Sequence, residues 1–595
     1  MPEKSGKQEK ATPPTGKPES SVPAPIPSVF GMLSPYRLMI ALLIALAIAA
    51  NVLTLFLPKL VSGVIDAYIG GTLNTFVLVL QFGSFALGIF FFTYLQSIVQ
   101  TYASEKVARD MRMQLVGKIS RQSYRFIEDR NPSKLLTNIT SDIDSIKMFV
   151  AQAIVSLVSS GVIIVGAAII LLTIDWRLAL VVLTIIPVIG GTFFVILRMV
   201  RKLFLQSREV IDWLNRVINE SIMGAALIRA LNSERFEHEK FSSANARARE
   251  IGIGILRLFS FMIPIITFVS SMGTLAVVAL GGYYVTQGSM TLGSFAAFNS
   301  YIIILIFPIL VIGFMSNVIA QASASYARIH EVLEAPDEKD EGTQTAALLG
   351  QIDVKDVTLT YGEKPALKNV SLSIQPHTKT AIIGPTAAGK TQLLNVMTGL
   401  TTPQKGEVDY DGRPLAEYER ASFYPQIGLV FQDSVLFNTT VRENIAFSTT
   451  VTDASLKKAI ETAELADFLG ALPNGLDTIV SERGTSLSGG QKQRIMLARA
   501  LALDPTILFL DDFTARVDAH TERKILANVE KNYPGLTLVS ITQKIAPIEK
   551  YDQIILLMEG EVLACGTHEE LMRTSPEYVQ IYDSQRSTNA YELRT

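Results

Sequence analysis

The chain has 595 residues, of which 49% are apolar and 18% charged, and it carries a formal net charge of −2. That length is too great for one domain, and a mean hydropathy of +0.32 is high for a soluble protein. The nearly neutral balance gives no sign of nucleic-acid binding, and a single cysteine excludes an internal disulfide. Charged residues are sparse before about residue 335 and ordinary after it, so a membrane half followed by a soluble half is expected.

The first 27 residues are rich in Pro, Lys, Glu, Ser and Gly and contain no long apolar stretch. Such a segment buries too little apolar surface to fold on its own, and a signal peptide needs an apolar region that is missing here. The segment 1–27 is therefore expected to be a disordered cytoplasmic tail.

Long uncharged runs mark the candidate membrane spans. A helix of about 20 residues crosses the hydrocarbon core of a bilayer, which is roughly 30 Å thick. The runs are 38–58, 76–104, 148–174, 178–197 and 258–327. The last run is too long for one helix and is divided by the polar stretch 286–291, so the sequence predicts six spans.

Lysine and arginine set the orientation of these spans. The segments 105–147 and 198–257 are rich in both, whereas the loops on the opposite side show only Lys59 and Arg177. Because positive residues accumulate on the cytoplasmic side, the two long segments and both termini are expected in the cytoplasm, with 175–177 as a tight external turn. The location that follows is the inner (cytoplasmic) membrane, crossed several times.

The two cytoplasmic segments carry helical patterns of apolar residues. The first pattern comprises Val107, Met111, Leu115 and Ile119, and the second comprises Val210, Leu214, Val217, Ser221 and Ile222. Such stripes are typical of amphipathic helices, so the spans are expected to continue as helices for about 30 Å into the cytosol. The alternative is a pair of solvated loops, which would leave the apolar stripes with nothing to pack on.

No Asp, Glu, Lys, Arg or His interrupts the apolar spans. A carrier driven by ions normally needs such groups at membrane depth, so the energy for transport is expected to come from elsewhere. The polar residues that could line a pathway are Asn51, Gln81, Gln96, Gln100, Asn299, Asn317 and Gln321. As many as half of them could serve only to hold helices together.

A charged linker over 334–349 leads into a soluble α/β pattern over 350–586, with a short tail at 587–595. A strand over 380–383 runs into the pattern G-x-x-x-x-G-K-[ST], a phosphate-binding loop in its required setting between a strand and a helix. The residues of the loop are Gly384, Pro385, Thr386, Ala387, Ala388, Gly389, Lys390 and Thr391, and the helix follows from Gln392.

The loop predicts how ATP and Mg²⁺ are bound. Backbone N–H groups at the start of the helix cradle the phosphates. Lys390 is expected to reach the β- and γ-phosphates, while the hydroxyl of Thr391 binds Mg²⁺.

Two further motifs follow the phosphate loop. The first, Leu-Ser-Gly-Gly-Gln, comprises Leu487, Ser488, Gly489, Gly490 and Gln491. The second is the pair Asp511 and Asp512, directly after an apolar strand over 506–510. In this order the motifs resemble ABC ATPases, and six spans before such a cassette resemble the ABC exporter half-transporters. The resemblance covers essentially the whole chain after the tail.

The resemblance implies a multidomain fold. An all-α polytopic membrane domain over 28–333, with six transmembrane helices and long cytoplasmic extensions, would precede an α/β P-loop NTPase (ABC) domain over 350–586. In that family two cassettes enclose two ATP molecules. Each ATP is bound by the phosphate loop of one chain and by the Leu-Ser-Gly-Gly-Gln signature of the other.

Further site residues are implied by matching position. Tyr361 would stack on adenine, although it could instead be an ordinary strand aromatic residue. Gln432 would contact Mg²⁺ and sense the transmembrane half, and Asp511 would hold Mg²⁺ directly or through water. Asp518 matches the aspartate of the D-loop, the segment that follows the Asp511 strand, and 481–484 resembles the segment that touches the coupling helices.

The chain departs from an active ATPase of this family at two catalytic positions. Asp512 stands where a glutamate is usual, and Gln543 stands where a switch histidine is usual. Asp is one methylene shorter than Glu, and a Gln amide never becomes cationic, so both changes should weaken activation of the attacking water. The pair resembles the slow, degenerate site of heterodimeric bacterial multidrug ABC exporters. Ala387 replaces a glycine that is usual in the phosphate loop. Its methyl group could slightly tighten the loop, but harmless drift is the favoured interpretation.

The sequence therefore predicts an ATP-driven exporter of hydrophobic or amphiphilic cargo, a drug or a lipid. It would pair with a second half-transporter and contact membrane lipids but no nucleic acid. One alternative is a homodimeric flippase for a lipid or polysaccharide precursor, working slowly with Asp512. Another is a membrane ATP sensor without transport. Some exporter-shaped ABC proteins import, so the direction of transport is an inference from the family.

Overall fold

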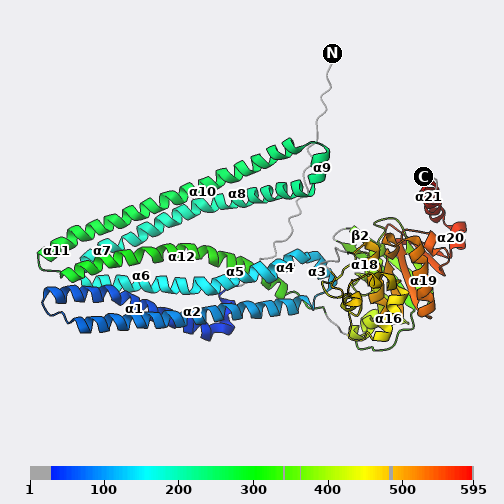
Figure 1. Ribbon diagram of the computed structural model, residues 1–595, viewed down its shortest axis with the longest axis horizontal. Coiled ribbons are helices and arrows are strands. Elements are labelled where there is room, and N and C mark those ends of the chain that lie inside the picture. Colours follow the sequence, from blue (N-terminus) through cyan, green and yellow to red (C-terminus); the bar gives the residue numbers. More distant parts are fainter. Residues whose placement is uncertain (1–27, 339–341, 362–363, 481–486, 593–595) are drawn as a thin grey trace, which may run out of the picture. The chain divides into compact units, whose positions relative to one another are not determined.

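The computed structural model describes residues 28–338, 342–361, 364–480 and 487–592. The expected coupling segment 481–484 and the tail 1–27 therefore lie outside the described residues. The chain divides into two compact units (Figure 1). The membrane unit comprises 1–120 and 131–335, and the nucleotide unit comprises 121–130 and 336–595.

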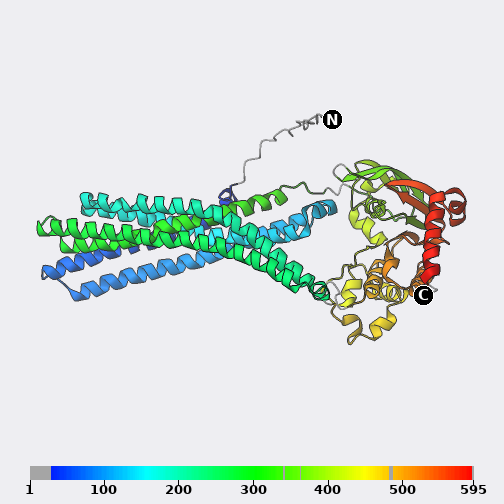
Figure 2. The same ribbon diagram turned by 90° about the horizontal axis from the view of Figure 1, so that it is seen from above.

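The membrane unit consists of helices, and six stretches of the described residues are long and apolar enough to cross a membrane. The sequence-based expectation of six spans is confirmed. The helices are α1 Arg37–Ile69, α2 Thr75–Ile119, α4 Pro132–Thr137, α5 Ile143–Met148, α6 Ile154–Ile174, α7 Trp176–Leu183, α8 Ile185–Met223, α9 Ala225–Ala230, α10 Glu234–Ala276, α11 Gly282–Thr286 and α12 Leu292–Leu333. Figure 2 shows the long helices running side by side within this unit.

Polar side chains at the expected turns start the helices. Asn74 caps α2, and its side chain accepts from Phe76 N at 3.1 Å. Asp175 caps α7 by accepting from the N–H groups of residues 177 and 178, both at 2.9 Å. Thr291 caps α12 by accepting from Ser294 N at 3.1 Å. Each cap satisfies backbone donors that the first turn of a helix leaves free, so these turns between spans are fixed locally.

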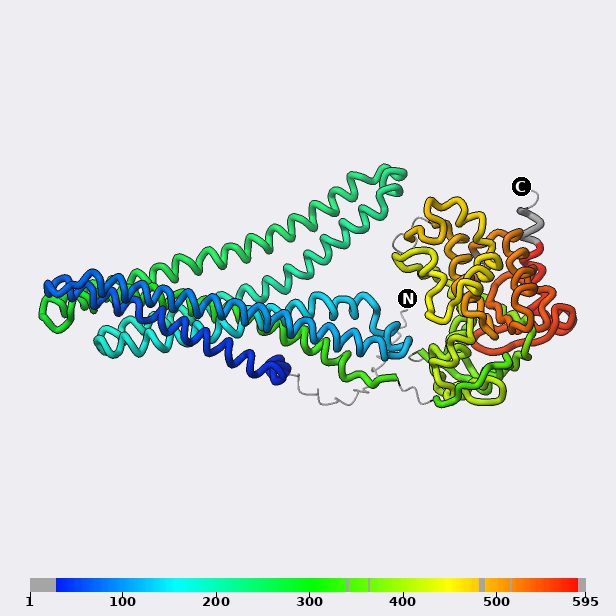
Figure 3. Tube along the Cα trace, turned by 60° about the horizontal axis from the view of Figure 1, so that its bottom comes forward, coloured from blue at the N-terminus to red at the C-terminus, as the bar shows by residue number. Residues whose placement is uncertain are grey.

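The cytoplasmic extensions are helical, as the apolar stripes predict. Helix α2 continues to Ile119 and buries Val107, Met111 and Leu115. Helices α8 and α10 pack against each other and are joined through α9. This hairpin separates from the other helices toward α9 (Figures 1 and 3).

The nucleotide unit contains two sheets. The first has the strand order β2-β1-β4-β5 and the second has the order β10-β9-β3-β8-β7-β6. The strands are β1 Ile352–Tyr361, β2 Lys364–Ile374, β3 Lys379–Ile383, β4 Lys405–Tyr410, β5 Arg413–Pro414, β6 Ile427–Val430, β7 Ile507–Asp511, β8 Thr537–Thr542, β9 Gln553–Met558 and β10 Glu561–Gly566. Strands β9, β3, β8, β7 and β6 are parallel to one another, and only β10 is antiparallel to its neighbour.

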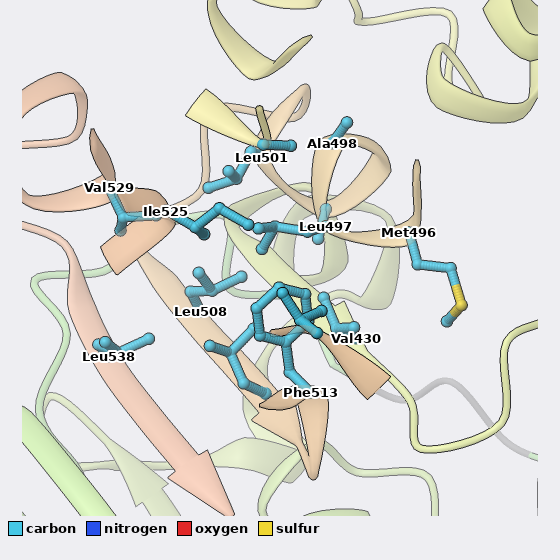
Figure 4. Close-up of a cluster of buried hydrophobic side chains, with 14 of the residues drawn as sticks. Val430, Met496, Leu497, Ala498, Leu501, Leu508, Phe513, Ile525, Val529 and Leu538 are labelled. Atoms are coloured by element: carbon cyan, nitrogen blue, oxygen red, sulfur yellow. The ribbon is translucent and has the colours of Figure 1, made fainter. Parts of the chain in front are cut away.

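Helices pack on the sheets and on one another in this unit. They are α13 Lys390–Met397, α14 Arg420–Phe423, α15 Val441–Ile445, α16 Asp453–Thr462, α17 Ala466–Gly470, α18 Gly489–Leu501, α19 Ala519–Asn532, α20 His568–Thr574 and α21 Pro576–Glu592. Figure 4 shows the packing of α18 and α19 onto the sheet through Leu497, Ile525 and Leu508. Because parallel strands end at the same edge, the residues that follow β3, β6, β7 and β8 gather there.

The short helix α3, Tyr124–Arg130, belongs to the nucleotide unit although the sequence places it between two membrane helices. The guanidinium of Arg125 lies 5.2 Å from the ring centroid of Tyr361. Arg121 pairs with Asp337 at 3.3 Å. The spacing of apolar residues gives no sign of this arrangement, because it depends on contacts between segments more than 200 residues apart.

Candidate nucleotide site

The phosphate loop lies between β3 and α13, and both of its glycines, Gly384 and Gly389, are required by the backbone. Gly384 has φ +155°, and a Cβ there would lie 2.0 Å from the carbonyl oxygen of Leu557. Gly389 has φ +98°, and a Cβ there would lie 2.6 Å from the carbonyl oxygen of Ala366. A side chain at either position would force the loop away from its neighbours.

Ala387 occupies the left-handed region with φ +65°. That conformation costs a residue with a side chain about 1–2 kcal/mol, whereas glycine adopts it freely. The interpretation of Ala387 as harmless drift does not include this conformational cost, because the residue type alone does not reveal the backbone conformation.

Replacing Ala387 by Gly is expected to stabilise the nucleotide unit by about 0.5–1 kcal/mol. The relief of the left-handed strain is partly offset by the greater freedom of glycine in the unfolded chain. Thermal unfolding of the purified full-length chain measures the effect. Ala388→Gly is the matched control, because Ala388 is buried and outside the left-handed region and should lose stability. A loss of stability in both variants would contradict the strain at Ala387.

Lys390 is buried, with 8% of its surface exposed. Its ammonium group donates to the carbonyl oxygens of Gly384 and Pro385, both at 2.8 Å. Burial lowers the pKa of Lys390, and the nearby carboxylates of Asp512 and Asp511 oppose that change. The ammonium therefore lies within the loop, where phosphate oxygens can replace the carbonyl partners.

Thr391 and Asp511, two of the residues expected to bind Mg²⁺, lie in contact with each other. The hydroxyl of Thr391 donates to a carboxylate oxygen of Asp511 at 3.2 Å. Burial raises the pKa of Asp511 to about 6, against the opposing effect of the Thr391 hydrogen bond. Hydroxyl, carboxylate and amide oxygens suit Mg²⁺, and Gln432 lines the same cavity. The residues present therefore fit the ion, which would be held by Thr391, Gln432 and Asp511.

More than half of the predicted site residues line one cavity of about 280 Å³. Its lining combines the loop residues Thr386 to Gln392 with Gln432, Asp511, Asp512 and Gln543. Asp512 lies beside the strand that leads to Gln543, because Asp512 N donates to Ile541 O of β8 at 2.9 Å. The cavity thus brings most of the loop residues expected to bind phosphate together with the two residues that stand where a glutamate and a histidine are usual.

The segment after β8 is hydrogen-bonded to Gln585, a residue that belongs to no sequence motif of the site. Gln585 of α21 donates to the backbone carbonyl of Gln543 at 2.6 Å, and its own oxygen accepts from Ile545 N at 2.9 Å. This leaves the side chain of Gln543 exposed at the cavity. A lone glutamine near the C-terminus carries no local signal, so only the tertiary structure shows this contact.

The signature residues Leu487 to Gln491 do not line the cavity. Ser488 caps α18, since its hydroxyl oxygen accepts from Gln491 N at 3.3 Å while Gln491 Oε1 accepts from Ser488 N at 2.8 Å. In this reciprocal cap the hydroxyl hydrogen of Ser488 is not used. It can therefore be donated to an oxygen outside the helix.

Tyr361 and Asp518 also lie outside the lining of the cavity. The hydroxyl of Tyr361 donates to the side-chain oxygen of Gln392 at 2.6 Å, which places its ring beside the start of α13. The carboxylate of Asp518 caps α19 by accepting from Thr521 N at 2.9 Å. This hydrogen bond lowers the pKa of Asp518. Its observed role within the chain is thus the start of a helix.

The polar residues of the spans differ in their contacts. Three of them join helices: Asn51 donates to Ser159 at 2.8 Å, Gln321 donates to Ser145 at 3.3 Å, and Gln100 donates to the carbonyl oxygen of Ala151. Asn299 donates to its own helix at Phe295 O. Those without a side-chain hydrogen bond among the described residues are Gln81, Gln96 and Asn317. These three are the remaining candidates for contact with cargo.

A phosphate-binding cassette joined to six membrane-spanning helices defines a membrane transporter driven by ATP. Residues 40–309 match the family described as ABC transporter transmembrane region, and residues 367–515 match the family described as ABC transporter. The uncharacterized ABC transporter ATP-binding protein YfiB of Bacillus subtilis is 33% identical, over 93% of this chain and 97% of its own. The chain belongs to the ABC transporter family, as an exporter half-transporter whose ATPase activity is coupled to transport.

Two further proteins are similar to this chain over most of its length, one in sequence and one in structure. An ATP-dependent lipid A-core flippase of Syntrophus aciditrophicus is 29% identical over 83% of both chains. A solved structure of a bacterial Atm1-family ABC exporter with ATP bound has a TM-score of 0.72 at 23% identity, covering 93% of this chain and 99% of its own. The predicted fold class is confirmed, and the chain is a multi-pass membrane protein with a cytoplasmic ATPase domain.

Proposed function

We propose that this chain exports hydrophobic or amphiphilic cargo as the subunit that carries the weaker ATP site of a heterodimeric exporter. The observation that carries the proposal is the lining of the nucleotide cavity. The residues expected to bind phosphate and Mg²⁺ from this chain's side line it, together with Asp512 and Gln543, which stand where the family usually has the residues that activate water.

The chemistry of these two residues supports a slow site. A general base must come within about 2.6–3.2 Å of the water it activates, and a displacement of about 1 Å can cost on the order of 100-fold in rate. Asp512 is one methylene shorter than glutamate. Gln543 can donate a hydrogen bond to the γ-phosphate but cannot carry a positive charge.

Two surfaces support a second chain. The signature lies outside this chain's own cavity, as expected if it contacts the ATP of a partner. The cytoplasmic part of the α8–α10 hairpin also leaves large apolar side chains more than half exposed, namely Ile222, Met223, Leu227, Leu231 and Phe236. Because this part lies in the segment rich in Lys and Arg, lipid does not cover it, and a protein partner would.

The second candidate is a homodimeric lipid flippase in the inner membrane. The relatives named ATP-dependent lipid A-core flippase favour it. The apolar spans suit lipid cargo in either case, so the two candidates differ in the partner rather than in the chemistry of the pathway.

Isolation of the tagged chain from membranes of its own source tests the proposal. The heterodimer requires an equimolar second ABC chain that carries Asp-Glu after its β7-equivalent strand and a switch histidine, and addition of cargo should stimulate the ATPase of the pair. Recovery of this chain with itself alone, active and stimulated by lipid, would favour the flippase.

Replacing Lys390 by Ala is expected to weaken ATP binding at this chain's site by about 10- to 100-fold. A charge-assisted hydrogen bond contributes about 1.5–3 kcal/mol, and each 1.4 kcal/mol is tenfold in affinity. Binding of a fluorescent ATP analogue to the purified chain measures the loss. Lys379→Ala is the matched control, because Lys379 pairs with Glu530 at 2.8 Å outside the cavity. Equal affinities in the two variants would contradict the role of Lys390.

A further inference from the structure

Arg516 lies against the start of the signature helix α18. It ends the 3-10 turn Phe513–Arg516 that follows Asp512. A Cβ placed on Gly489 would lie 3.1 Å from Cδ of Arg516, and a Cβ placed on Gly490 would lie 2.9 Å from its carbonyl oxygen. The two signature glycines therefore provide the space in which the backbone and the aliphatic stem of Arg516 pack.

The guanidinium group of Arg516 is exposed. Among the residues that the structure describes, it has neither an ion pair nor a hydrogen bond. Other arginines of this unit are engaged: Arg442 pairs with Asp477 at 3.2 Å, and Arg499 donates to the carbonyl oxygens of Asn444 and Val435. Packing of its stem thus fixes where Arg516 lies, while its charge has no partner among the residues that the structure describes.

The stem of Arg516 packs at the N-terminal end of α18, where an anion would be favoured. The first turn of α18 presents free N–H groups and the positive end of the helix dipole. A cation held beside that end is repelled, whereas an anion would be attracted by the helix, the guanidinium and the free hydroxyl hydrogen of Ser488 together. Arg516 does not line this chain's own cavity, where Asp511 and Asp512 supply negative charge.

We propose that Arg516 binds the γ-phosphate of the ATP held by the partner's phosphate loop. The inference rests on the proposed function, in which the signature of this chain acts on the partner's nucleotide. A guanidinium presents a planar fork of donors that matches phosphate oxygens. Positive charge at the transferred phosphoryl group stabilises the transition state of hydrolysis. The chain with weaker catalytic residues would thereby add a catalytic cation to the stronger site.

ATP turnover by the assembled complex tests the inference. Arg516→Ala is expected to lower turnover by about tenfold or more, and Arg516→Lys should recover part of it, because the charge remains without the fork. Affinity for ADP should be unchanged, since ADP lacks the γ-phosphate. Arg523→Ala is the matched control: Arg523 is exposed on the neighbouring α19 and donates only to Ala519 O of its own helix.

The outcomes separate this inference from the proposed function. If Arg516→Ala behaves like Arg523→Ala while Ser488→Arg stops turnover, the role of Arg516 is overturned and the shared site stands. If neither Arg516 nor Ser488 matters, the shared site fails as well. An equal loss of ADP and ATP affinity would overturn the contact with the γ-phosphate. An unfolding midpoint that falls in Arg516→Ala and returns in Arg516→Lys, with turnover fully restored, would show a structural role instead.

Discussion

Replacing Ser488 by Arg is expected to lower ATP turnover of the assembled complex by about 100- to 1,000-fold. Loss of one donor to developing charge in a transition state has a cost of that size, and the bulk of arginine also blocks close approach of a phosphate. The donor in question is the hydroxyl of Ser488, whose oxygen caps α18 and whose hydrogen has no acceptor among the described residues. Steady-state hydrolysis by the purified complex measures the change.

The capping role of Ser488 requires a control. Loss of an N-cap costs about 1 kcal/mol of stability, so part of any effect could arise from α18 itself. Thr452 forms the same reciprocal cap at the start of α16, outside the nucleotide cavity. Thr452→Ala should therefore lose similar stability and keep its turnover. Equal turnover in the two variants would place Ser488 in a purely structural role.

Turnover of the Ser488→Arg complex should be compared with turnover of the Asp512→Ala complex, because the proposed asymmetry predicts which loss is larger. Asp512→Ala removes the weak base of this chain's own site and should cost the complex little, because the partner's site performs most of the hydrolysis. Ser488 belongs to the same chain, yet its replacement should cost far more. A complex in which Ser488→Arg is harmless and Asp512→Ala abolishes turnover would reverse the proposed asymmetry.

Much of the membrane unit could be predicted because its determinants are local. Uncharged runs indicate the number of spans, and polar residues in the two breaks expected between spans, Asp175 and Thr291, are the caps that begin α7 and α12. The extent of α2 into the cytosol follows from the spacing of Val107, Met111 and Leu115. The assignment of α3 to the nucleotide unit could not be predicted, since contacts across hundreds of residues leave no periodic pattern.

In the nucleotide site, too, some features could be predicted from the sequence and others could not. The residues of the cavity lie in short motifs at the ends of parallel strands, so Lys390, Asp511 and Gln543 could be predicted from the sequence as members of one site. Two contacts depend on tertiary structure and could not be predicted. Gln585 donates a hydrogen bond to the backbone of Gln543, and the stem of Arg516 packs against Gly489. The left-handed backbone of Ala387 likewise has no signal in the residue type, which favours other conformations.

The purified chain without a partner is expected to hydrolyse ATP about 100-fold more slowly than the assembled complex. In a pair made only of this chain, every site would contain Asp512 and Gln543, and misplacement of the base by about one methylene has a cost of that order. Binding should persist, because Lys390, Thr391 and the loop backbone are unchanged. Parallel measurements of ATP binding and of phosphate release by the chain and by the complex would show this separation.

Restoring the usual residues provides the converse experiment. The double variant Asp512→Glu and Gln543→His should raise turnover of the chain alone, because it returns a base of full length and a side chain that can become cationic. Lys379→Ala, outside the cavity, should leave turnover of the chain alone unchanged. The heterodimer would be contradicted by rapid hydrolysis in the unmodified chain alone, since a homodimer would then suffice. If the double variant stays slow while ATP still binds, the cause of the slow site lies elsewhere than in these two residues.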